Sequence, residues 1–267
     1  MHAPLAPPVR RFGAVNWLGL WTLYVREVHR FLKVSMQTIF APVITTLIFL
    51  AVFLLAMGGQ GRSIAGIPYL QFLAPGLVMM AMTQNAFANT TSSIMISKMQ
   101  GNIIDLLMPP LSPMELTLGL ALGGLTRGLA VGVVVTVFMA IFVHVELASP
   151  LAALFYASAA SLMLSTLGVI GGVWADKFDH LAAITNFVVT PLAFLSGTFY
   201  SVEQLPPAWL RVALCNPFFY MIDGFRYGLT GRAEASLLVG VIFLIAINAA
   251  LLWLAYAMIA RGYKLKA

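Results

Sequence analysis

The chain has 267 residues, of which 61% are hydrophobic and only 9% are charged. No soluble core needs so much apolar material, so the composition excludes an ordinary soluble domain and predicts an integral membrane protein. The net charge of +6 suits membrane topology and contact with anionic membrane lipid, and nucleic acid is not expected as a partner. The single cysteine, Cys215, excludes an internal disulfide, and neither redox chemistry nor a metal is expected.

Residues 1–16 contain three prolines and two arginines without an apolar stretch close behind, which predicts a flexible cytoplasmic tail rather than a cleaved signal. Residues 17–34 follow with apolar side chains at helical spacing. These are Trp17, Leu20, Trp21, Tyr24, Val28 and Phe31, with Arg26, Arg30 and Lys33 on the opposite face. The pattern predicts an amphipathic helix on the cytoplasmic leaflet. It serves either as a membrane anchor or as a lever that contacts a cytoplasmic partner.

Six uncharged or nearly uncharged stretches are long enough to cross the bilayer, which takes about 20 residues of helix. They are residues 36–57, 71–94, 116–143, 151–174, 182–199 and 236–259. An even number of spans puts both termini on one side. Ten basic residues, among them Arg26, Lys98 and Lys177, fall on the terminal side, against Arg62, Arg211, Arg226 and Arg232 on the other. The positive-inside rule therefore predicts cytoplasmic termini.

The segment between the second and third predicted spans, residues 101–110, contains a short apolar run, IIDLLM, that ends at Pro109 and Pro110. Because proline cannot continue a helix, the run is a stub of under three turns. Ser112, Pro113 and Glu115 predict the capped start of the next helix. On one interpretation the segment is an ordinary connector between helices, which accounts for Ser112, Pro113 and Glu115. On the other, an apolar stub that faces the cytosol is a docking element. On this second interpretation the apolar side chains of the stub, Ile103, Ile104, Leu106 and Leu107, are exposed.

The second predicted span contains several polar residues, among them Thr83, Asn85 and Asn89, and the two asparagines lie on one helical face. Polar groups in hydrocarbon need partners, so these side chains face either protein or a water-filled path. The alternative to a path is a contact between helices that is held by interhelical hydrogen bonds. Arg127, near the cytoplasmic third of the third span, either snorkels to the interface or pairs with a neighbouring group. The loop Asp176 to His180 is a weak metal candidate and is interpreted as a solvated connector.

Residues 196–231 are apolar, aromatic, charged and broken by prolines, which suits neither a plain loop nor a plain span. Asn216 is a favourable helix cap and Pro217 suits the first turn. We therefore expect this segment to re-enter or cap the membrane before the last span. Asp223 and Arg226 either contact cargo or brace this segment, and bracing is favoured.

The chain has no P-loop, HExxH or GxSxG motif, so we do not expect it to be an enzyme by itself. All nine Asp and Glu residues can be placed outside the hydrocarbon core, which leaves little for proton coupling. The alternatives are an ATP-independent secondary transporter or channel, a membrane enzyme and a structural scaffold.

Two stretches carry a family resemblance. Residues 101–116, GNIIDLLMPPLSPMEL, are similar to a "G…LL..P.S..E" cytoplasmic element, and residues 216–226, NPFFYMIDGFR, to an NP…Y…R signature. Together with the order of predicted elements, these resemble the membrane permease of ABC type-2 (ABC-2) exporters over nearly the whole chain. Asp105 stands where many relatives carry Glu.

The resemblance implies an all-α inner-membrane protein with an interfacial helix over 17–34, a six-span domain over 35–267 and a re-entrant hairpin before the last span. It implies a homodimer, or a close heterodimer, that binds two copies of a separate ATPase subunit, which would carry ATP and Mg. Alternating access would move an amphipathic, lipid-linked or drug-like substrate outward. The resemblance assigns ATPase coupling to a helix at about 101–110, with Gly101, Asn102, Ile104, Asp105, Leu106, Leu107 and Pro109. It assigns an external gate at about 200–231, formed by two short helices over about 202–214 and 217–229, to Asn216, Pro217, Tyr220, Asp223 and Arg226. We add Thr83, Asn85, Asn89 and Phe194 as possible pathway residues.

Overall fold

The structure is a computed structural model that describes residues 13, 15–57, 63–64 and 66–265. Most of the predicted tail over 1–16, and Arg62, lie outside the described residues. The elements are α1 (Trp17–Leu32), the π-helical turn η1 (Met36–Phe40), α2 (Ala41–Met57), β1 (Ser63–Ile64), β2 (Ile67–Pro68), α3 (Tyr69–Met99), α4 (Ile103–Leu107), α5 (Pro113–Met139), α6 (Pro150–Trp174), α7 (Phe178–Ile184), the π-helical turn η3 (Thr185–Val189), α8 (Thr190–Phe194), the 3-10 turn η4 (Val202–Gln204), α9 (Pro207–Leu214), α10 (Pro217–Thr230) and α11 (Leu237–Ala260). The two short strands pair antiparallel.

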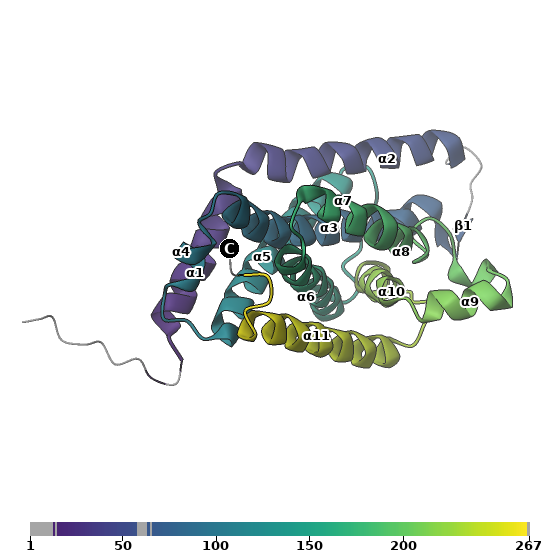
Figure 1. Cartoon of the computed structure of the whole chain (residues 1–267). Helices are drawn as coiled ribbons and strands as arrows, with labels where there is room; N and C mark the ends of the chain where they lie inside the picture. Colours follow the sequence, from purple (N-terminus) through teal and green to yellow (C-terminus); the bar gives the residue numbers. More distant parts are fainter. Residues whose placement is uncertain (1–12, 14, 58–62, 65, 266–267) are drawn as a thin grey trace, which may run out of the picture.

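Helices α3, α5 and α6 form the centre of a bundle, with α2 and α11 on opposite outer sides (Figure 1). Small residues let the central helices approach closely. A Cβ added at Gly128 of α5 would lie 2.7 Å from the Ser161 hydroxyl of α6. The central helices are therefore fixed by close packing. Most of the apolar surface of α2 and α11, in contrast, is not covered by other residues of the chain.

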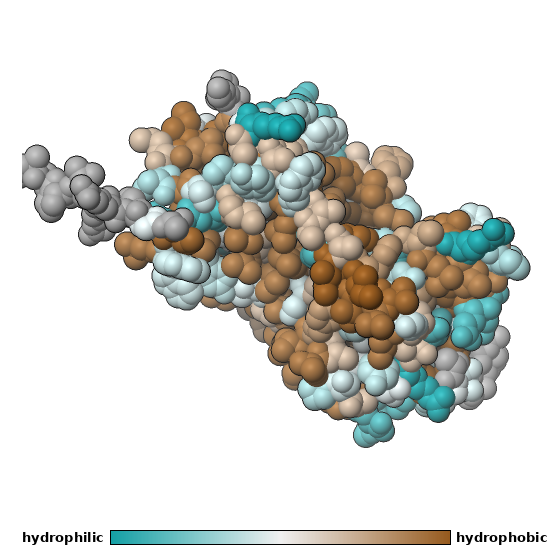
Figure 2. Space-filling model, turned by 90° about the horizontal axis from the view of Figure 1, so that it is seen from below, coloured by the Kyte–Doolittle hydropathy of each residue, from teal (hydrophilic) through white to brown (hydrophobic). Residues whose placement is uncertain are grey.

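Among the described residues, four helices are long and apolar enough to cross a membrane: Met36–Ala56, Pro113–Met139, Pro150–Trp174 and Leu237–Ala260. They coincide with the first, third, fourth and sixth predicted spans. Figure 2 shows brown hydrophobic side chains over the middle of the face on the α11 side, with hydrophilic residues mainly toward its edges. The second and fifth predicted spans are helical, but α3 carries many polar residues and the continuous helix Phe178–Phe194 is shorter. Six crossings therefore remain a prediction.

The fifth predicted span is displaced, because its helix occupies 178–194 instead of 182–199. Its C-terminal end is fixed by local hydrogen bonds that the hydropathy pattern does not contain. The hydroxyls of Ser196 and Thr198 both donate to the Ala193 carbonyl oxygen, and Gly197 adopts φ +73°. A positive φ favours glycine and ends the helical run.

Helix α1 runs across one end of the bundle, beside α4 (Figure 1). Its buried face differs from the predicted one: Leu23, Glu27 and Phe31 are buried, whereas Trp17 and Trp21 are exposed. Of the apolar face predicted from the sequence, the two tryptophans point away from the chain, Phe31 is buried, and Leu20, Tyr24 and Val28 are half-buried. The C-terminal residues lie at the same end of the bundle, where Leu265 shares a buried cluster with Leu23.

Candidate functional site

The predicted coupling segment forms the single turn α4, held at one end of the bundle between α1 and the start of α5 (Figure 1). Gly101 precedes it with φ +72°, and Asp105 lies in its first turn. Ile103 and Leu106 are 3% and 4% exposed, which corrects the expectation that all four apolar side chains are exposed. They pack into the cluster that includes Leu23.

The outward face of this turn remains apolar. Ile104 is 55% exposed, Leu107 39% and Met108 75%. The two pairs differ because the helical period places Ile103 and Leu106 on one face and Ile104 and Leu107 on the other. The turn therefore presents a fixed apolar knob.

A shared carboxylate joins the starts of α1 and α5. Glu115 and Ser112 form the predicted capping box of α5, which is confirmed. The second carboxylate oxygen of Glu115 accepts from the Asn16 backbone N–H at 2.6 Å, and the Asn16 amide donates to the Pro110 carbonyl oxygen at 3.0 Å. Asn16 also caps α1 by accepting from the Gly19 N–H. The connector after α4 and the first turns of α1 and α5 thus form one hydrogen-bonded node.

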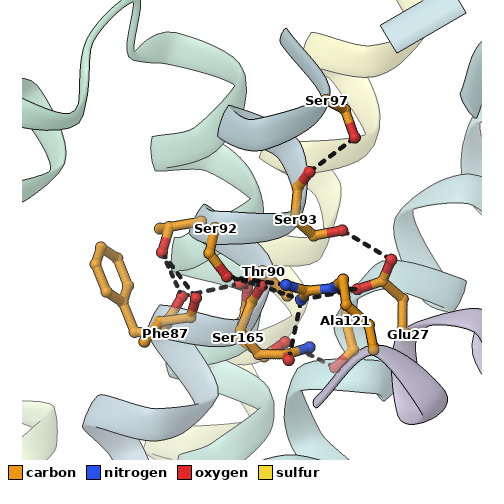
Figure 3. Close-up of polar contacts among 12 residues, drawn as sticks. Glu27, Phe87, Thr90, Ser92, Ser93, Ser97, Ala121 and Ser165 are labelled. Carbon is orange, nitrogen blue, oxygen red and sulfur yellow. Dashed lines mark hydrogen bonds and ion pairs between the residues drawn. The ribbon is translucent and has the colours of Figure 1, made fainter. Parts of the chain in front are cut away.

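Further along α1, a buried polar network ties this helix to α3. Glu27 is 0% exposed, accepts from the Ser93 hydroxyl at 2.7 Å and pairs with Arg30 at 3.1 Å; Figure 3 shows the Glu27 side chain directed at Ser93. Arg30 also donates to the backbone oxygen of Asn89 at 2.6 Å and to the Ser92 hydroxyl. Arg30 therefore lies against α3, which corrects its predicted place on the polar face of α1.

The predicted pathway residues separate into two groups. Asn85 and Phe194 line a cavity between α2, α3, α5 and α8. Thr83 and Asn89 are buried and do not line it: the Thr83 hydroxyl donates to the Met79 carbonyl oxygen, and Asn89 accepts from Arg30. For Asn89 the hydrogen bond from Arg30 of α1 fits the interpretation of contacts between helices, although its Nδ2 is buried without a hydrogen-bond partner. The Thr83 hydroxyl is satisfied within α3 itself.

Arg127 also lines this cavity, and it pairs instead of snorkelling. Its Nη2 donates to the Asn85 Oδ1 at 2.9 Å. The helix that carries it has 27 residues, and Arg127 lies within one residue of the midpoint, whereas the sequence predicted a position near the cytoplasmic third. The displacement follows from the boundaries, because α5 begins and ends before the predicted span.

At the other end of the bundle, α9 and α10 are separated at Asn216 (Figure 1). The Asn216 side chain accepts from the Phe218 N–H at 3.0 Å, and Pro217 begins α10, so the predicted cap is confirmed. Its amide also donates to the Leu192 carbonyl oxygen at 2.7 Å, which ties α10 to α8. Helix α9 begins at Pro207, later than predicted, because the residues from Val202 to Gln204 form a separate 3-10 turn. Tyr220, another predicted gate residue, is buried.

Arg226 is the centre of the buried polar contacts in α10. Its Nη2 donates to the Gly197 carbonyl oxygen at 2.7 Å and its Nε to that of Phe72 at 3.3 Å, while the guanidinium carbon lies 3.7 Å from the centroid of the Phe72 ring. Nη1 lies 3.8 Å from a carboxylate oxygen of Asp223 and 3.8 Å from one of Glu234. Asp223 accepts the backbone N–H groups of Glu234 and Ala235. One guanidinium thus links α10 to α3, to the turn after α8 and to the loop before α11.

Asp176 and His180, the weak metal candidates, have other contacts. The Lys264 ammonium donates to Asp176 at 2.7 Å, and the Asp176 N–H donates to the His180 Nδ1 at 3.4 Å. The hydrogen bond from Lys264 lowers the pKa of Asp176, and the same contact raises the pKa of Lys264. Within the described ranges no three His, Cys, Asp or Glu side chains are grouped to hold a metal.

Three functional contacts were not predicted from the sequence. Glu27 had a usable signal, since it lies four residues from both Leu23 and Phe31, which share its face. Glu115 was predicted only as a cap, and its bond to Asn16 depends on how α1 meets α5. Glu234 gave no signal, because its approach to Arg226 is set by the fold of a loop.

The arrangement defines a helical membrane protein whose central bundle carries an apolar knob at one end and a polar-braced helix pair at the other. The sequence model of the ABC-2 type transporters matches residues 19–230, and the chain belongs to this family of transport permeases. It is 35% identical over 250 residues to the inner membrane transport permease YadH of Escherichia coli K12, covering 94% of this chain and 98% of that protein. It is 25% identical over 227 residues to nodulation protein J of Rhizobium leguminosarum bv. viciae, covering 84% and 86% respectively.

Proposed function

We propose that this chain is the transmembrane subunit of an ATP-driven exporter that works as a dimer with two copies of a separate ATPase subunit. The dimer moves an amphipathic, lipid-linked or drug-like substrate outward by alternating access. ATP and Mg are held by the partner, and this chain itself supplies the path and the coupling surface. Family membership supports the permease role.

The observation that carries the proposal is the knob on α4. Its outward side chains, including Ile104, Leu107 and Met108, are exposed in the connector between α3 and α5, which faces the cytosol rather than lipid in the topology that we propose. Fixed apolar side chains in water indicate a protein contact. Ile103 and Leu106 hold the knob against α1 and α5, so a partner that moves it also moves those helices.

Topology and location follow from the same assignment. We place six crossings in the membrane: at about 1.5 Å per residue, α3 reaches ~46 Å and Phe178–Phe194 ~26 Å, against a hydrocarbon core of ~30 Å. The excess of Lys and Arg at the α1 and α4 end supports a cytoplasmic position for it and for both termini. The name of the E. coli relative, an inner membrane transport permease, supports the inner membrane.

In the proposed cycle the ATPase pulls on α4, and the node at Glu115 passes the movement to α1 and α5. The first, second and fifth spans tilt, so that a path between the protomers opens past the segment at about 200–231. Nucleotide biases two conformations, as transport requires. Asp223 and Arg226 brace the external gate, because their polar atoms are used by neighbouring protein groups.

The test is the double variant Ile104→Glu and Leu107→Glu in the tagged full chain, co-expressed with its ATP-binding subunit. Leu106 is left unchanged because it is buried and its replacement would disturb the bundle. Burial of each apolar side chain contributes ~1.5–3 kcal/mol, so recovery of the ATPase should fall at least about tenfold, with loss of ATP-dependent transport.

Tyr263→Glu is the matched control, since Tyr263 is an exposed apolar side chain at the same end of the bundle and outside α4. It should leave recovery of the ATPase unchanged. Normal recovery in the double variant would refute the coupling role of α4. If no ATPase is recovered with the unaltered chain, an ATP-independent transporter or channel becomes the better assignment.

A further inference from the structure

The cavity between α2, α3, α5 and α8 has a volume of about 590 Å³, within the range of about 300–1,000 Å³ usual for small-molecule sites. Asn85 lies within one residue of the midpoint of α3, as Arg127 does in α5. The cavity therefore lies at mid-depth in the bundle. In the proposed topology this depth lies within the hydrocarbon layer, so the polar groups of the cavity require a chemical explanation.

The lining changes character along the helices. On α3 the polar residues Gln84, Asn85 and Ser92 lie toward the α4 end, and Gln37 continues this half at the start of the first span. Toward the other end, Phe49, Leu77, Phe194 and Phe199 replace them. Phe199 stacks on both Phe194 and Phe53, at centroid distances of 5.2 and 5.0 Å. The cavity is thus amphipathic, with a polar half and an aromatic half.

Arg127 stands where the two halves meet, and among the lining residues it alone carries a charge. Its Nη2 is oriented by Asn85, but its Nε is buried without a hydrogen-bond partner. No carboxylate within the described part of the chain lies at ion-pair distance from it, in contrast to Arg30, which is paired with Glu27. An uncompensated guanidinium at mid-bilayer costs ~2.5–3.5 kcal/mol even by insertion measurements.

We propose that this cavity binds an anionic amphiphile, with its phosphate, sulfate or carboxylate headgroup on Arg127 and its apolar chain against the aromatic half. A guanidinium can donate two parallel N–H groups to two oxygens of such an acid, and the anion neutralises the charge that the chain leaves uncompensated. The inference deepens the proposed transport function and rests on it for the role of cargo. Arg127 is then the residue that selects substrate by headgroup charge.

The experiment measures binding to the full chain in phosphatidylcholine nanodiscs, without an ATPase or nucleotide. The probes are oleoyl lysophosphatidic acid and oleoyl lysophosphatidylcholine, which share a chain and differ in headgroup charge. We expect the unaltered protein to prefer the anionic probe by at least about tenfold. Arg127→Gln should remove that preference, and Arg127→Lys should retain part of it because a point charge remains.

Two further variants locate the effect. Arg211→Gln removes an exposed arginine from α9 and should leave the preference intact. Thr45→Trp adds bulk from an exposed position on the cavity wall, so it should reduce binding of both probes while Arg127 is retained and should not disturb the core. This second variant keeps the test decisive if Arg127→Gln fails to fold.

Phosphatidylglycerol added to the nanodisc distinguishes the source of the ligand. Displacement of the anionic probe identifies a bilayer lipid as occupant, whereas persistence identifies a separate single-chain amphiphile; either result supports the anionic site. Equal binding of the two probes by the unaltered protein, or an undiminished preference in Arg127→Gln, would overturn it. Because no ATPase is present, selective binding combined with no ATP-dependent transport would refute the proposed function and leave this site standing.

Discussion

Replacing Arg226 with alanine should release α10 from its neighbours. The change removes the donors to Phe72 and Gly197 and leaves the buried carboxylates of Asp223 and Glu234 without their cation. Loss of one partner from a buried ion pair costs ~3–5 kcal/mol, because the remaining charge is desolvated without compensation. At about 1.4 kcal/mol per factor of ten, local opening of α10 should become ~140- to ~3,700-fold more frequent.

Hydrogen exchange of a peptide covering α10 measures this opening directly, since amides exchange when the segment unfolds locally. Exchange should accelerate in Arg226→Ala and to a smaller extent in Arg226→Lys, which keeps the charge but loses the forked geometry. Arg232→Ala is the control, because Arg232 is exposed nearby in the chain. If α10 exchanges at the same rate in Arg226→Ala as in the unaltered protein, the bracing role is wrong.

Two further changes test packing and the node at the α4 end. Gly228→Ala should lower the free energy of unfolding by ~1–3 kcal/mol, because the new Cβ would lie 2.6 Å from a backbone nitrogen of α6. Gly171→Ala is the control: its Cβ would lie 3.5 Å from the nearest atom, so the change should be neutral or stabilising in thermal unfolding. Equal melting temperatures for the two variants would contradict this packing. Glu115→Ala should speed hydrogen exchange at the Asn16 amide by about fivefold or more, as loss of a buried acceptor costs ~1–3 kcal/mol. Met114→Ala, an exposed neighbour, should not, and unchanged exchange in Glu115→Ala would show that α1 is held by packing alone.

The long helices could be predicted from the sequence wherever apolar residues run without interruption. The first, fourth and sixth predicted spans end within about two residues of the observed helices. The predicted end of the fifth span was wrong because the helix is ended by Ser196, Gly197 and Thr198. The hydroxyls of Ser196 and Thr198 replace helical hydrogen bonds in a stretch that is still apolar on average. Hydropathy locates material that enters a membrane, but not the residue at which a helix stops.

In the candidate site, contacts between residues close in the sequence could be predicted, whereas contacts between distant residues could not. The Asn216 cap and the box at Ser112 and Glu115 were predictable because each is made within three residues. The buried face of α1 was not, because tryptophan is equally suited to lipid and to protein, and hydrophobicity does not distinguish the two. Glu27 was therefore assigned to no contact, although together with Arg30 it fixes α1 to α3.

The two π-helical turns have a consequence for how the bundle can deform. η1 leads into α2 and η3 into α8, and these helices supply Phe49 and Phe194 to the same cavity. A π turn holds one more residue than the α-helical turn, and such turns are places where a helix changes direction while its backbone stays hydrogen-bonded. The cavity thus has two walls, α2 and α8, that each begin at a π-helical turn, beside the closely packed α3 and α5. Bending at these turns would change the width of the cavity without separating α3 from α5.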